Sequence, residues 1–428
     1  MSKKNILIVG GGIIGIVLSK FLSISKKYNI TILDNSNRLG GFLKSVKIKK
    51  FTFDLGTHYI RETGNKNVDK ILFKKIRRKW INIDFLKSGN YFKKQIVEHN
   101  QFVNIKELNE YKNSLKEILQ KSKSNIKNKF KNEHARCIDI FGKIITKKII
   151  APIMLKYTGL KLQKIPAGLS SKFGLGRIII NNKDLTLKLK KQKKFDKCIA
   201  FETNREGVSK EKSYYPKKGC VDEFIKYFLE KNTKVMLNKS IRNFNIKKNY
   251  INEVVLSDNQ IIKFDKIFWT APKNLYFKIL RKPIAKRNTK KIFWKFTNLT
   301  SNKKFMSKCF YLNIHDPKTN IYRITLYDNL QKNKNNRMTV ESVSPKQKFS
   351  QESNIKKYLL KIGLISKNQK INFLNSITIP VGIPLRKEKL LKKNNIKNIE
   401  FIGGGFFNQR NQEQTIIDAY DLAKKKYG

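Results

Sequence analysis

Three glycines near the N-terminus have a spacing that could hold a phosphate group. Gly10, Gly12 and Gly15 follow a short apolar run and precede apolar residues at helical spacing. In a strand–turn–helix unit, the first glycine permits the tight turn, the second lets a pyrophosphate approach the backbone, and the third allows close helix packing. The free N–H groups and the dipole of the helix N-terminus then favour the anion. The pattern predicts dinucleotide contacts from Gly10, Gly12, Ile13, Ile14 and Gly15.

A carboxylate stands where a second strand of the same unit is expected to end. The apolar run 29–33 leads into Asp34, so the order is strand, glycine turn, helix, strand and acid. At this place a carboxylate accepts hydrogen bonds from ribose hydroxyls, and the whole context is far more specific than the glycine spacing alone. A glycine turn without a nucleotide is the alternative. We therefore expect Asp34 to bind the ribose of a dinucleotide.

The residues after Asp34 indicate which dinucleotide binds. The stretch 34–41, with Arg38, Gly40 and Gly41, resembles the corresponding segment of the amine oxidase superfamily of flavoproteins. That superfamily includes monoamine oxidases, protoporphyrinogen oxidases, phytoene desaturases and, more distantly, UDP-galactopyranose mutases. The resemblance implies FAD, with the paired glycines close to its phosphates and ribityl chain and Arg38 near its pyrophosphate. Arg38 could instead be an ordinary surface cation in so basic a chain.

A second segment of the same resemblance contains the candidate catalytic residue. Residues 53–58, Phe-Asp-Leu-Gly-Thr-His, are similar to a strand and glycine turn that run along the flavin ring in these families. The resemblance implies that Thr57 and His58 lie at the flavin and that His58 positions the substrate or tunes the flavin. A neutral histidine with a pKa of about 6.5 suits both tasks. The alternative is a histidine hydrogen-bonded into its own loop.

Two later segments extend the resemblance to the middle and the end of the chain. Residues 214–219 and the strand that follows them are similar to a segment whose backbone lies under the adenine. Residues 401–405 and a helix from about Thr415 resemble the C-terminal FAD segment. Many members carry Gly-Asp where this chain has Gly403-Gly404, and this departure favours the mutases over the monoamine oxidases. The implied FAD contacts in these segments are Ile241, Gly403, Gly404, Thr415 and Ile416.

Several side chains could contact a substrate. They are a tyrosine and an arginine just after residues 53–58, and three arginines elsewhere in the chain. We expect no catalytic triad, since a flavin itself accepts the hydride. An arginine can bind a carboxylate or phosphate through two parallel hydrogen bonds. In a chain with 93 Lys and Arg, each arginine could equally be solvated surface. The candidate substrate contacts are Tyr59, Arg61, Arg177, Arg323 and Arg410.

The formal net charge of +62 has two explanations. A field of this size attracts polyanions such as nucleic acid or acidic membrane. The alternative is a compositional bias, because the lysines are spread along the whole chain and no nucleic-acid-binding module is recognisable. We favour the compositional explanation, which predicts no specific nucleic-acid partner. Peripheral membrane contact and an anionic small-molecule substrate stay open.

Other sequence features exclude several classes of protein. No run approaches the roughly 18 apolar residues of a membrane helix, and the N-terminus lacks a signal-peptide pattern, so a cytoplasmic protein is expected. The scattered cysteines indicate reduced thiols rather than disulfides or a zinc site, and the histidines lack metal-ligand spacing, so no metal is expected. The cysteines are Cys137, Cys198, Cys220 and Cys309.

These segments together predict a mixed α/β fold with a Rossmann-like FAD-binding domain that is discontinuous in sequence. An interleaved substrate domain of helices and an antiparallel sheet is expected to fill the gaps. The expected FAD-binding parts are 1–63, 213–275 and 379–428, and the expected substrate-domain parts are a mostly helical 64–212 and a β-rich 276–378.

The resemblance implies an FAD-dependent oxidoreductase that exchanges a hydride or electrons with a small or amphipathic substrate. FAD is expected to bind non-covalently, since no cysteine lies near the C-terminal motif. A flavin-dependent sugar-nucleotide mutase is the second interpretation. In the third, the chain is a non-enzymatic binding protein of the same fold, as the Rab GDP dissociation inhibitors are. The substrate, the electron acceptor and the oligomeric state stay open.

Overall fold

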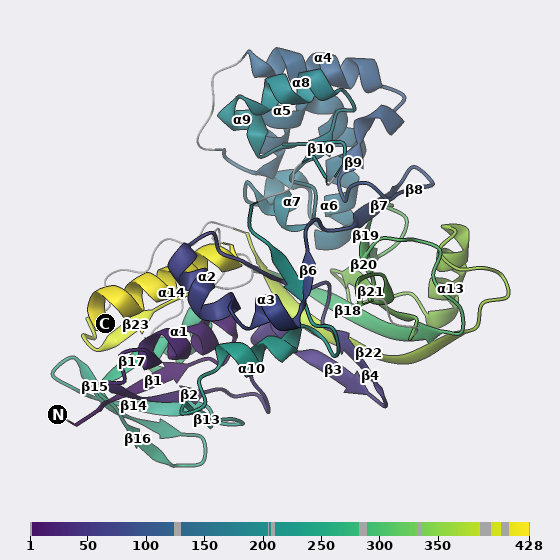
Figure 1. Cartoon of the computed structure of the whole chain (residues 1–428). Coiled ribbons are helices and arrows are strands. Elements are labelled where there is room, and N and C mark those ends of the chain that lie inside the picture. The colour runs from purple at the N-terminus through teal and green to yellow at the C-terminus, as the bar shows by residue number, and fades with distance from the viewer. Residues whose placement is uncertain are drawn as a thin grey trace. The chain divides into compact units, whose positions relative to one another are not determined.

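The structure is a computed structural model that describes most of the chain (Figure 1). The described residues are 2–123, 130–203, 205–206, 210–281, 289–331, 335–385, 395–403 and 411–427. The chain forms two units, each assembled from separated segments. Unit 1 contains Met1–Ile83, Lys210–Arg287 and Lys389–Gly428, and unit 2 contains Asp84–Ser209 and Asn288–Glu388.

Unit 1 is built on a parallel sheet whose described strands have the order β13-β2-β1-β17-β23. These strands are β1 (Lys4–Val9), β2 (Tyr28–Leu33), β13 (Lys234–Met236), β17 (Lys266–Trp269) and β23 (Ile399–Phe401). The central β1 pairs in parallel with β2 and β17. Residues 6–9 are buried because both faces of the sheet are covered. The carboxyl ends of β1 and β2 lie side by side, where a doubly wound fold binds its ligand.

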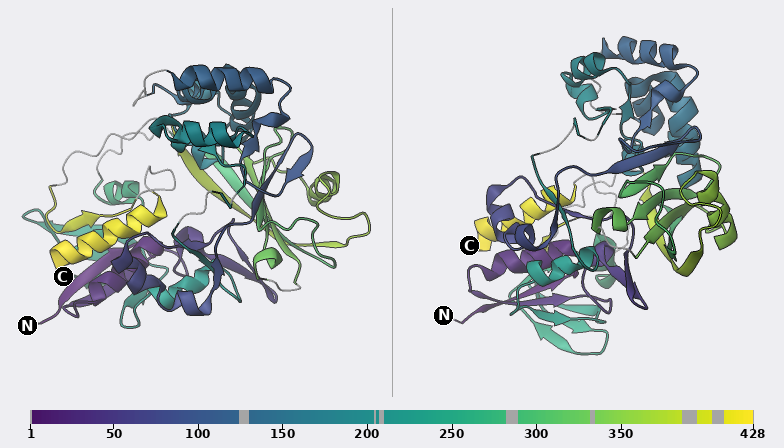
Figure 2. Two further views of the ribbon diagram at one scale, coloured as in Figure 1. Left: turned by 45° about the horizontal axis from the view of Figure 1, so that its top comes forward. Right: turned by 45° about the vertical axis from the view of Figure 1, so that its right-hand side comes forward.

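Helices cover one face of this sheet. α1 (Ile13–Ser23) follows β1 directly, and α14 (Gln412–Tyr427) packs along it. Both views of Figure 2 show the yellow C-terminal helix beside the purple N-terminal one. The rings of Phe21 and Tyr420 meet edge to face, with their centroids 5.3 Å apart. The apolar side chains of α1 recur with the helical period, so they form one buried stripe against the sheet and α14.

A β-meander covers the opposite face of the sheet. Its strands β14 (Ile241–Lys247), β15 (Tyr250–Leu256) and β16 (Ile261–Lys263) are antiparallel neighbours. With α11 (Lys273–Ile279) they enclose a core that includes Leu7 and Val9 of β1 and Trp269 of β17. Alternate residues of a strand point to opposite faces, so β1 contributes to the cores on both sides of the sheet.

Shorter elements of unit 1 carry the segments predicted to lie near the flavin ring. β3 (Ser45–Ile48) and β4 (Phe51–Asp54) form a hairpin, and β5 (Ile60–Arg61), β12 (Ser213–Tyr215) and β6 (Ile81–Ile83) form an antiparallel sheet. The unit also contains α2 (Lys66–Phe73), α3 (Ile76–Lys79), a 3-10 turn at Val221–Phe224 and α10 (Ile225–Phe228). β12 therefore brings the middle of the chain beside the strand that follows the turn at residues 55–59.

Unit 2 contains a mixed sheet in the order β22-β18-β21-β20-β19-β7-β8. Its strands are β7 (Ser88–Phe92), β8 (Gln95–Val97), β18 (Thr289–Ser301), β19 (Tyr311–Ile314), β20 (Ile321–Leu326), β21 (Arg337–Ser344) and β22 (Ile371–Pro384). Neighbouring strands are antiparallel except for β19 and β7. One face packs with α13 (Glu352–Lys361) in an apolar core that includes Met338, Val340 and Leu359. Unit 2 thus has a core of its own.

A helical layer forms the rest of unit 2. It contains α4 (Tyr111–Ser122), α5 (Glu133–Ile145), a π-helical turn at Thr146–Ile150, α6 (Ala151–Thr158), α7 (Leu169–Lys172), α8 (Lys183–Lys190) and α9 (Lys193–Asp196). The short strands β9 (Val103–Asn104), β10 (Ile178–Ile179) and β11 (Ile199–Ala200) form a parallel sheet among these helices. α4 packs on α5, and α6 packs on β18 and β21.

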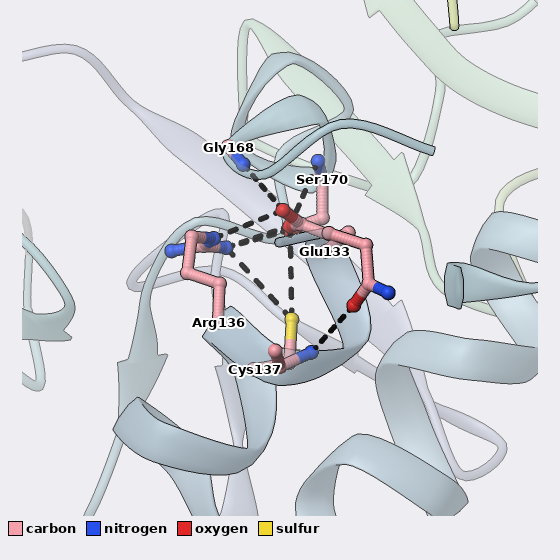
Figure 3. Close-up of polar contacts among 7 residues, drawn as sticks. Glu133, Arg136, Cys137, Gly168 and Ser170 are labelled. Atoms are coloured by element: carbon pink, nitrogen blue, oxygen red, sulfur yellow. Dashed lines mark hydrogen bonds and ion pairs between the residues drawn. The ribbon is translucent and has the colours of Figure 1, made fainter. Parts of the chain in front are cut away.

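A buried carboxylate of α5, paired with an arginine of the same helix, joins two helices of this layer (Figure 3). Glu133, at the start of α5, is fully buried and accepts hydrogen bonds from Arg136 Nε at 3.0 Å and Arg136 Nη2 at 2.8 Å. The same carboxylate accepts bonds from the backbone N–H groups of Gly168 and Ser170 and from the Ser170 hydroxyl. Burial, reinforced by the neighbouring Glu133 carboxylate, raises the pKa of the Cys137 thiol. Glu133 therefore ties α5 to the N-terminus of α7.

The predicted fold class is confirmed. A parallel sheet begins with a βαβ unit, and a separate, largely antiparallel sheet lies in the other unit. In the part of the chain that the structure describes, no helix is long and apolar enough to cross a membrane. The four cysteines are free thiols, and all are buried.

Candidate dinucleotide-binding site

The three glycines of the first turn have different surroundings. A Cβ on Gly15 would lie 2.0 Å from the Gly10 carbonyl oxygen, so only a glycine lets α1 pack there. Gly10 has a positive φ of 110°, and a Cβ there would lie 2.5 Å from Thr270 Oγ1. A Cβ on Gly12 would meet no described atom within 4 Å. Gly12 is also the N-cap of α1, which no described side chain caps. Among the described residues there is thus space beside Gly12 at the N-terminus of α1, where an anion site would need it.

Asp34 joins the end of β2 to this turn. Its Oδ2 accepts a hydrogen bond from the backbone N–H of Gly11 at 2.6 Å, and its Oδ1 accepts one from the N–H of Ser36 at 2.9 Å. The Ser36 hydroxyl donates to the same Oδ1. A carboxylate has about four acceptor sites. Asp34 therefore holds the glycine turn and keeps acceptor capacity for a ribose hydroxyl.

The second glycine pair lies against the first turn. The Gly40 N–H donates to the Gly11 carbonyl at 2.8 Å, and Gly12 and Gly40 form a parallel bridge. A Cβ on Gly41 would lie 3.1 Å from Gly12 Cα, so a side chain there would push the two segments apart. Gly12, Gly40 and Gly41 thus form one continuous backbone wall.

Two cations lie beside this wall. Arg38 donates from Nη2 to the Ser45 carbonyl, and its Nη1 lies 4.0 Å from Asp222 Oδ2, with 45% of its side chain exposed. Burial lowers the pKa of Lys44, while the charge of Asp34 raises it and that of Arg38 lowers it further. Arg38 and Lys44 therefore place positive charge near Asp34, although Arg38 is fixed through β3 and not through the glycine turn.

The turn at residues 55–59 places His58 at a defined position. Gly56 has a φ of 101°, and His58 Nε2 lies 2.9 Å from the Leu55 carbonyl oxygen. Thr57, His58 and Tyr59 are each partly buried. The contact with Leu55 agrees with the simpler interpretation of His58 as a residue hydrogen-bonded into its loop. A catalytic role for His58 stays a prediction.

The C-terminal segment reaches the start of α1. A Cβ on Gly403, which has a φ of 84°, would lie 3.9 Å from two side-chain carbons of Ile14 and from Thr415 Cγ2. α14 begins at Gln412 rather than near Thr415, and Ile416 is buried in its first turns. Gly403, Thr415 and Ile14 are thus brought together in unit 1. Gly404 and Arg410 lie outside the described residues.

The middle segment lies beside Asp34 through its backbone. Asn238 N–H donates to the Ser36 carbonyl at 3.0 Å, and Lys239 N–H donates to the Asp34 carbonyl at 3.2 Å. Ile241 itself begins β14, and its side chain belongs to the core of the meander. Ile241 therefore follows two residues after Lys239, whose backbone contacts Asp34, the residue proposed to bind the ribose.

The arginines predicted to bind substrate have partners within their own units. Arg61 Nη2 lies 3.1 Å from Glu211 Oε2 in unit 1. In unit 2, Arg177 Nε donates to the Lys197 carbonyl at 3.0 Å. Arg323, also in unit 2, donates to Asn313 Oδ1 at 2.9 Å and to the Tyr322 hydroxyl at 2.8 Å. These contacts stabilise each arginine in the structure and assign no substrate to it.

Sequence reasoning missed a buried carboxylate in the segment that contains His58. Asp54 is fully buried at the end of β4 and accepts hydrogen bonds from the Ser45 hydroxyl at 3.0 Å, the Tyr215 hydroxyl at 2.6 Å and the Val221 N–H at 2.9 Å. Burial raises the pKa of Asp54 from 3.8 to about 6, against the opposing effect of these three donors. Asp54 stood in the quoted motif, but its partners are distant in sequence. Lys44 had no sequence signal at all.

Comparisons with known proteins agree with this geometry. Residues 8–75 match the family described as an NAD(P)-binding Rossmann-like domain. No curated protein matches the chain. A reduced UDP-galactopyranose mutase is 12% identical with a TM-score of 0.66, and the match covers 89% of this chain and 83% of that chain.

Two further solved structures match along nearly their whole lengths. A protein from Exiguobacterium sp. 255-15, provisionally named a protoporphyrinogen oxidase, is 14% identical with a TM-score of 0.65, over 100% of this chain and 99% of that chain. An oxidoreductase from Methanosarcina mazei is 10% identical with a TM-score of 0.62, over 98% of this chain and 100% of that chain.

This chain has the flavin amine oxidase-like fold. The matched residues 8–75 contain the three glycines of the first turn, Asp34 and the paired glycines, so the predicted Rossmann-like domain is confirmed. At these low identities the likeness to solved structures establishes the fold and not the reaction. The cofactor and the chemistry must therefore be argued from the site.

Proposed function

We propose that the chain binds FAD non-covalently and acts as an FAD-dependent oxidoreductase. The observation that carries this proposal is the open space at Gly12, in front of the uncapped N-terminus of α1. A pyrophosphate fits such a position because free N–H groups and the helix dipole stabilise its charge. Asp34 supplies the ribose acceptor, and Lys44 and Arg38 supply positive charge close by.

FAD suits this site better than a nicotinamide dinucleotide does. The backbone wall continues from Gly12 to Gly40 and Gly41, and Gly403 and Thr415 lie near Ile14. These segments are the ones that resemble the flavoprotein motifs, in the same order along the chain. A long cofactor with a ribityl arm needs contacts beyond the first glycine turn, and these segments supply glycine backbone for them.

When bound, a flavin supplies hydride acceptance, and the protein supplies orientation and electrostatics. In this chain the turn that carries Thr57 and His58 is the proposed neighbour of the ring. His58 would hold or release a proton at Nδ1, because Nε2 is close to the Leu55 carbonyl. Tyr59 and Arg61 follow directly and are the first candidates for orienting a small or amphipathic substrate.

A Gly12→Ala substitution tests the location of the cofactor. The φ of −73° and ψ of 179° at Gly12 suit alanine, and the added methyl meets no described atom within 4 Å, so the fold is expected to survive. The methyl would occupy the pyrophosphate position. We expect the FAD dissociation constant, measured by flavin fluorescence titration, to rise by about 10-fold or more.

Gly382→Ala is the matched control. Gly382 lies in β22 of unit 2, and a Cβ there would make ordinary contacts of 3.8–4.0 Å with Thr289. This variant is expected to bind FAD as the unchanged protein does. A purified protein that is colourless and takes up no FAD contradicts the proposal and favours a binding protein. FAD binding by Gly12→Ala at full affinity contradicts the location.

A sugar-nucleotide mutase is the second candidate, favoured by the structural likeness to a reduced UDP-galactopyranose mutase. In such an isomerase, reduced flavin promotes rearrangement without net oxidation. Incubation with UDP-galactopyranose after dithionite reduction distinguishes the two functions. Product formation without consumption of an electron acceptor supports the mutase, whereas bleaching of the oxidised flavin by a substrate supports the oxidoreductase.

A further inference from the structure

The hydrogen bonds around Asp54 connect two segments that are far apart in sequence. Asp54 Oδ1 accepts from the Ser45 hydroxyl and from the Val221 N–H, and Oδ2 accepts from the Tyr215 hydroxyl. Ser45 belongs to β3, Tyr215 ends β12, and Val221 begins a 3-10 turn. One carboxylate therefore fixes the β3–β4 hairpin to the middle segment of the chain.

The connection continues from Ser45 to the paired glycines. Ser45 N–H donates to Asp222 Oδ2 at 3.2 Å, and Asp222 N–H donates to Ser45 Oγ at 3.4 Å. Arg38, which precedes Gly40 by two residues, donates to the Ser45 carbonyl. The order of contacts is therefore Asp54, Ser45 and Arg38, which leads from the buried carboxylate to the backbone wall at Gly40 and Gly41.

Asp54 also stands directly before the turn that contains His58. The chain leaves β4 at Asp54 and turns at Gly56. After that turn, β5 pairs with β12, the strand that ends in Tyr215. Both ends of the turn are thus fixed to the same strand, at one end by the Asp54–Tyr215 hydrogen bond and at the other by backbone pairing.

We propose that Asp54 is a positioning residue that holds the flavin-ring turn and the paired-glycine wall in register for FAD. This role rests on the proposed function, because it concerns the cofactor named there. Asp54, Ser45 and Tyr215 have no exposed surface, so Asp54 acts through its neighbours and does not touch the cofactor. The fully buried carboxylate keeps its place because three donors compensate it.

Asp69 offers a matched control for a buried carboxylate. It is 5% exposed, lies in α2 of the same unit, and accepts bonds from Thr63 N–H at 2.8 Å, Thr63 Oγ1 at 2.8 Å and Gly64 N–H at 3.0 Å. Asp69 is therefore, like Asp54, a buried carboxylate held by hydroxyl and backbone N–H donors. Asp69 holds the start of α2 and is not part of the Ser45–Arg38 connection.

The test compares FAD affinity with apoprotein stability in four single variants, Asp54→Ala, Asp54→Asn, Tyr215→Phe and Asp69→Asn, and in the double variant Asp54→Asn/Tyr215→Phe. We expect Asp54→Ala to raise the FAD dissociation constant by about 10-fold or more. Asp54→Asn keeps an acceptor oxygen for Ser45 and Val221, so a smaller rise is expected. Tyr215→Phe should give a rise similar to that of Asp54→Asn, and the double variant should be less than additive. Asp69→Asn should lower apoprotein stability without changing FAD affinity.

A spectroscopic signature separates positioning from general destabilisation. In Asp54→Asn saturated with FAD, the visible absorbance and circular dichroism bands of the flavin should shift, because the ring turn is held less firmly. Equal FAD affinity and equal spectra in the Asp54 and Asp69 variants overturn this role. If the unchanged protein binds no FAD, the proposed function is wrong. That failure is distinct from failure of the Asp54 role, because it is seen without any variant.

Discussion

Gly12 and Gly15 belong to one motif, but a side chain would have different surroundings at the two positions. A Cβ on Gly15 would overlap the Gly10 carbonyl, whereas one on Gly12 would meet no described atom within 4 Å. Gly15 is therefore a packing residue, whereas Gly12 borders open space and is the position proposed to face the cofactor. Substitutions at the two positions should separate fold stability from cofactor affinity, which a match to the motif alone cannot do.

The raised pKa of Asp54 predicts that the unfolding free energy depends on pH. Its pKa is about 6 in the folded chain, above its ordinary value of 3.8. The folded state thus binds this proton more tightly than the unfolded state, so the stabilisation is fully present below about pH 4 and is lost as pH rises through about 6. A shift of about two pKa units corresponds to about 3 kcal/mol.

Urea unfolding of the apoprotein checks this sign. Relative to Asp54→Asn, the unchanged protein should lose up to about 3 kcal/mol of unfolding free energy between about pH 4 and about pH 7. Both proteins carry the same other titratable groups, so the difference isolates Asp54. A difference that is equal at the two pH values would show that Asp54 does not titrate between them.

At the scale of elements, the Glu133 carboxylate links α5 to α7, because it accepts hydrogen bonds from Gly168 and Ser170 while it pairs with Arg136 of its own helix. Removing one partner of a buried ion pair leaves the other charge uncompensated, which costs about 3–5 kcal/mol. Glu133→Gln should lower the unfolding free energy by that amount, as measured by urea unfolding. Glu110→Gln is the control, because its pair with Lys148 at 3.0 Å is partly exposed and should contribute far less to the unfolding free energy. Equal losses in the two variants would contradict this assignment.

Local elements could be predicted from the sequence, whereas their long-range partners could not. The strand, glycine turn and helix over residues 5–22 are set by neighbouring residues, so their pattern was sufficient. The start of α14 was placed too late, although Asn411, whose side chain accepts from Gln414 N–H, is a capping signal. The bond between Tyr215 and Asp54 joins residues 161 positions apart, and no local pattern encodes such a contact.

At the scale of the whole molecule, the net charge of +62 sets the response to salt. Mutual repulsion among like charges destabilises a folded chain. Raising the ionic strength from about 0.01 M to about 0.15 M shortens the Debye length from about 30 Å to about 8 Å. The melting temperature should rise by about 2–4 °C, which is the effect of about 1 kcal/mol on a large domain.

Sodium chloride is the salt to use for this measurement, because sulfate also strengthens apolar burial. Differential scanning calorimetry of the apoprotein gives the melting temperature directly. A melting temperature that is constant or falls with sodium chloride would show that local ion pairs outweigh the overall repulsion.

The parallel sheet of unit 1 has a consequence for synthesis on the ribosome. β1 and β2 emerge early, but β23, which pairs with β17, and α14, which packs on α1, are translated after unit 2. The nascent chain therefore carries an unfinished parallel sheet throughout the translation of unit 2, and the side of α1 that packs on α14 is still uncovered. Chaperones that bind exposed apolar segments would therefore meet this chain through α1, before unit 1 is complete.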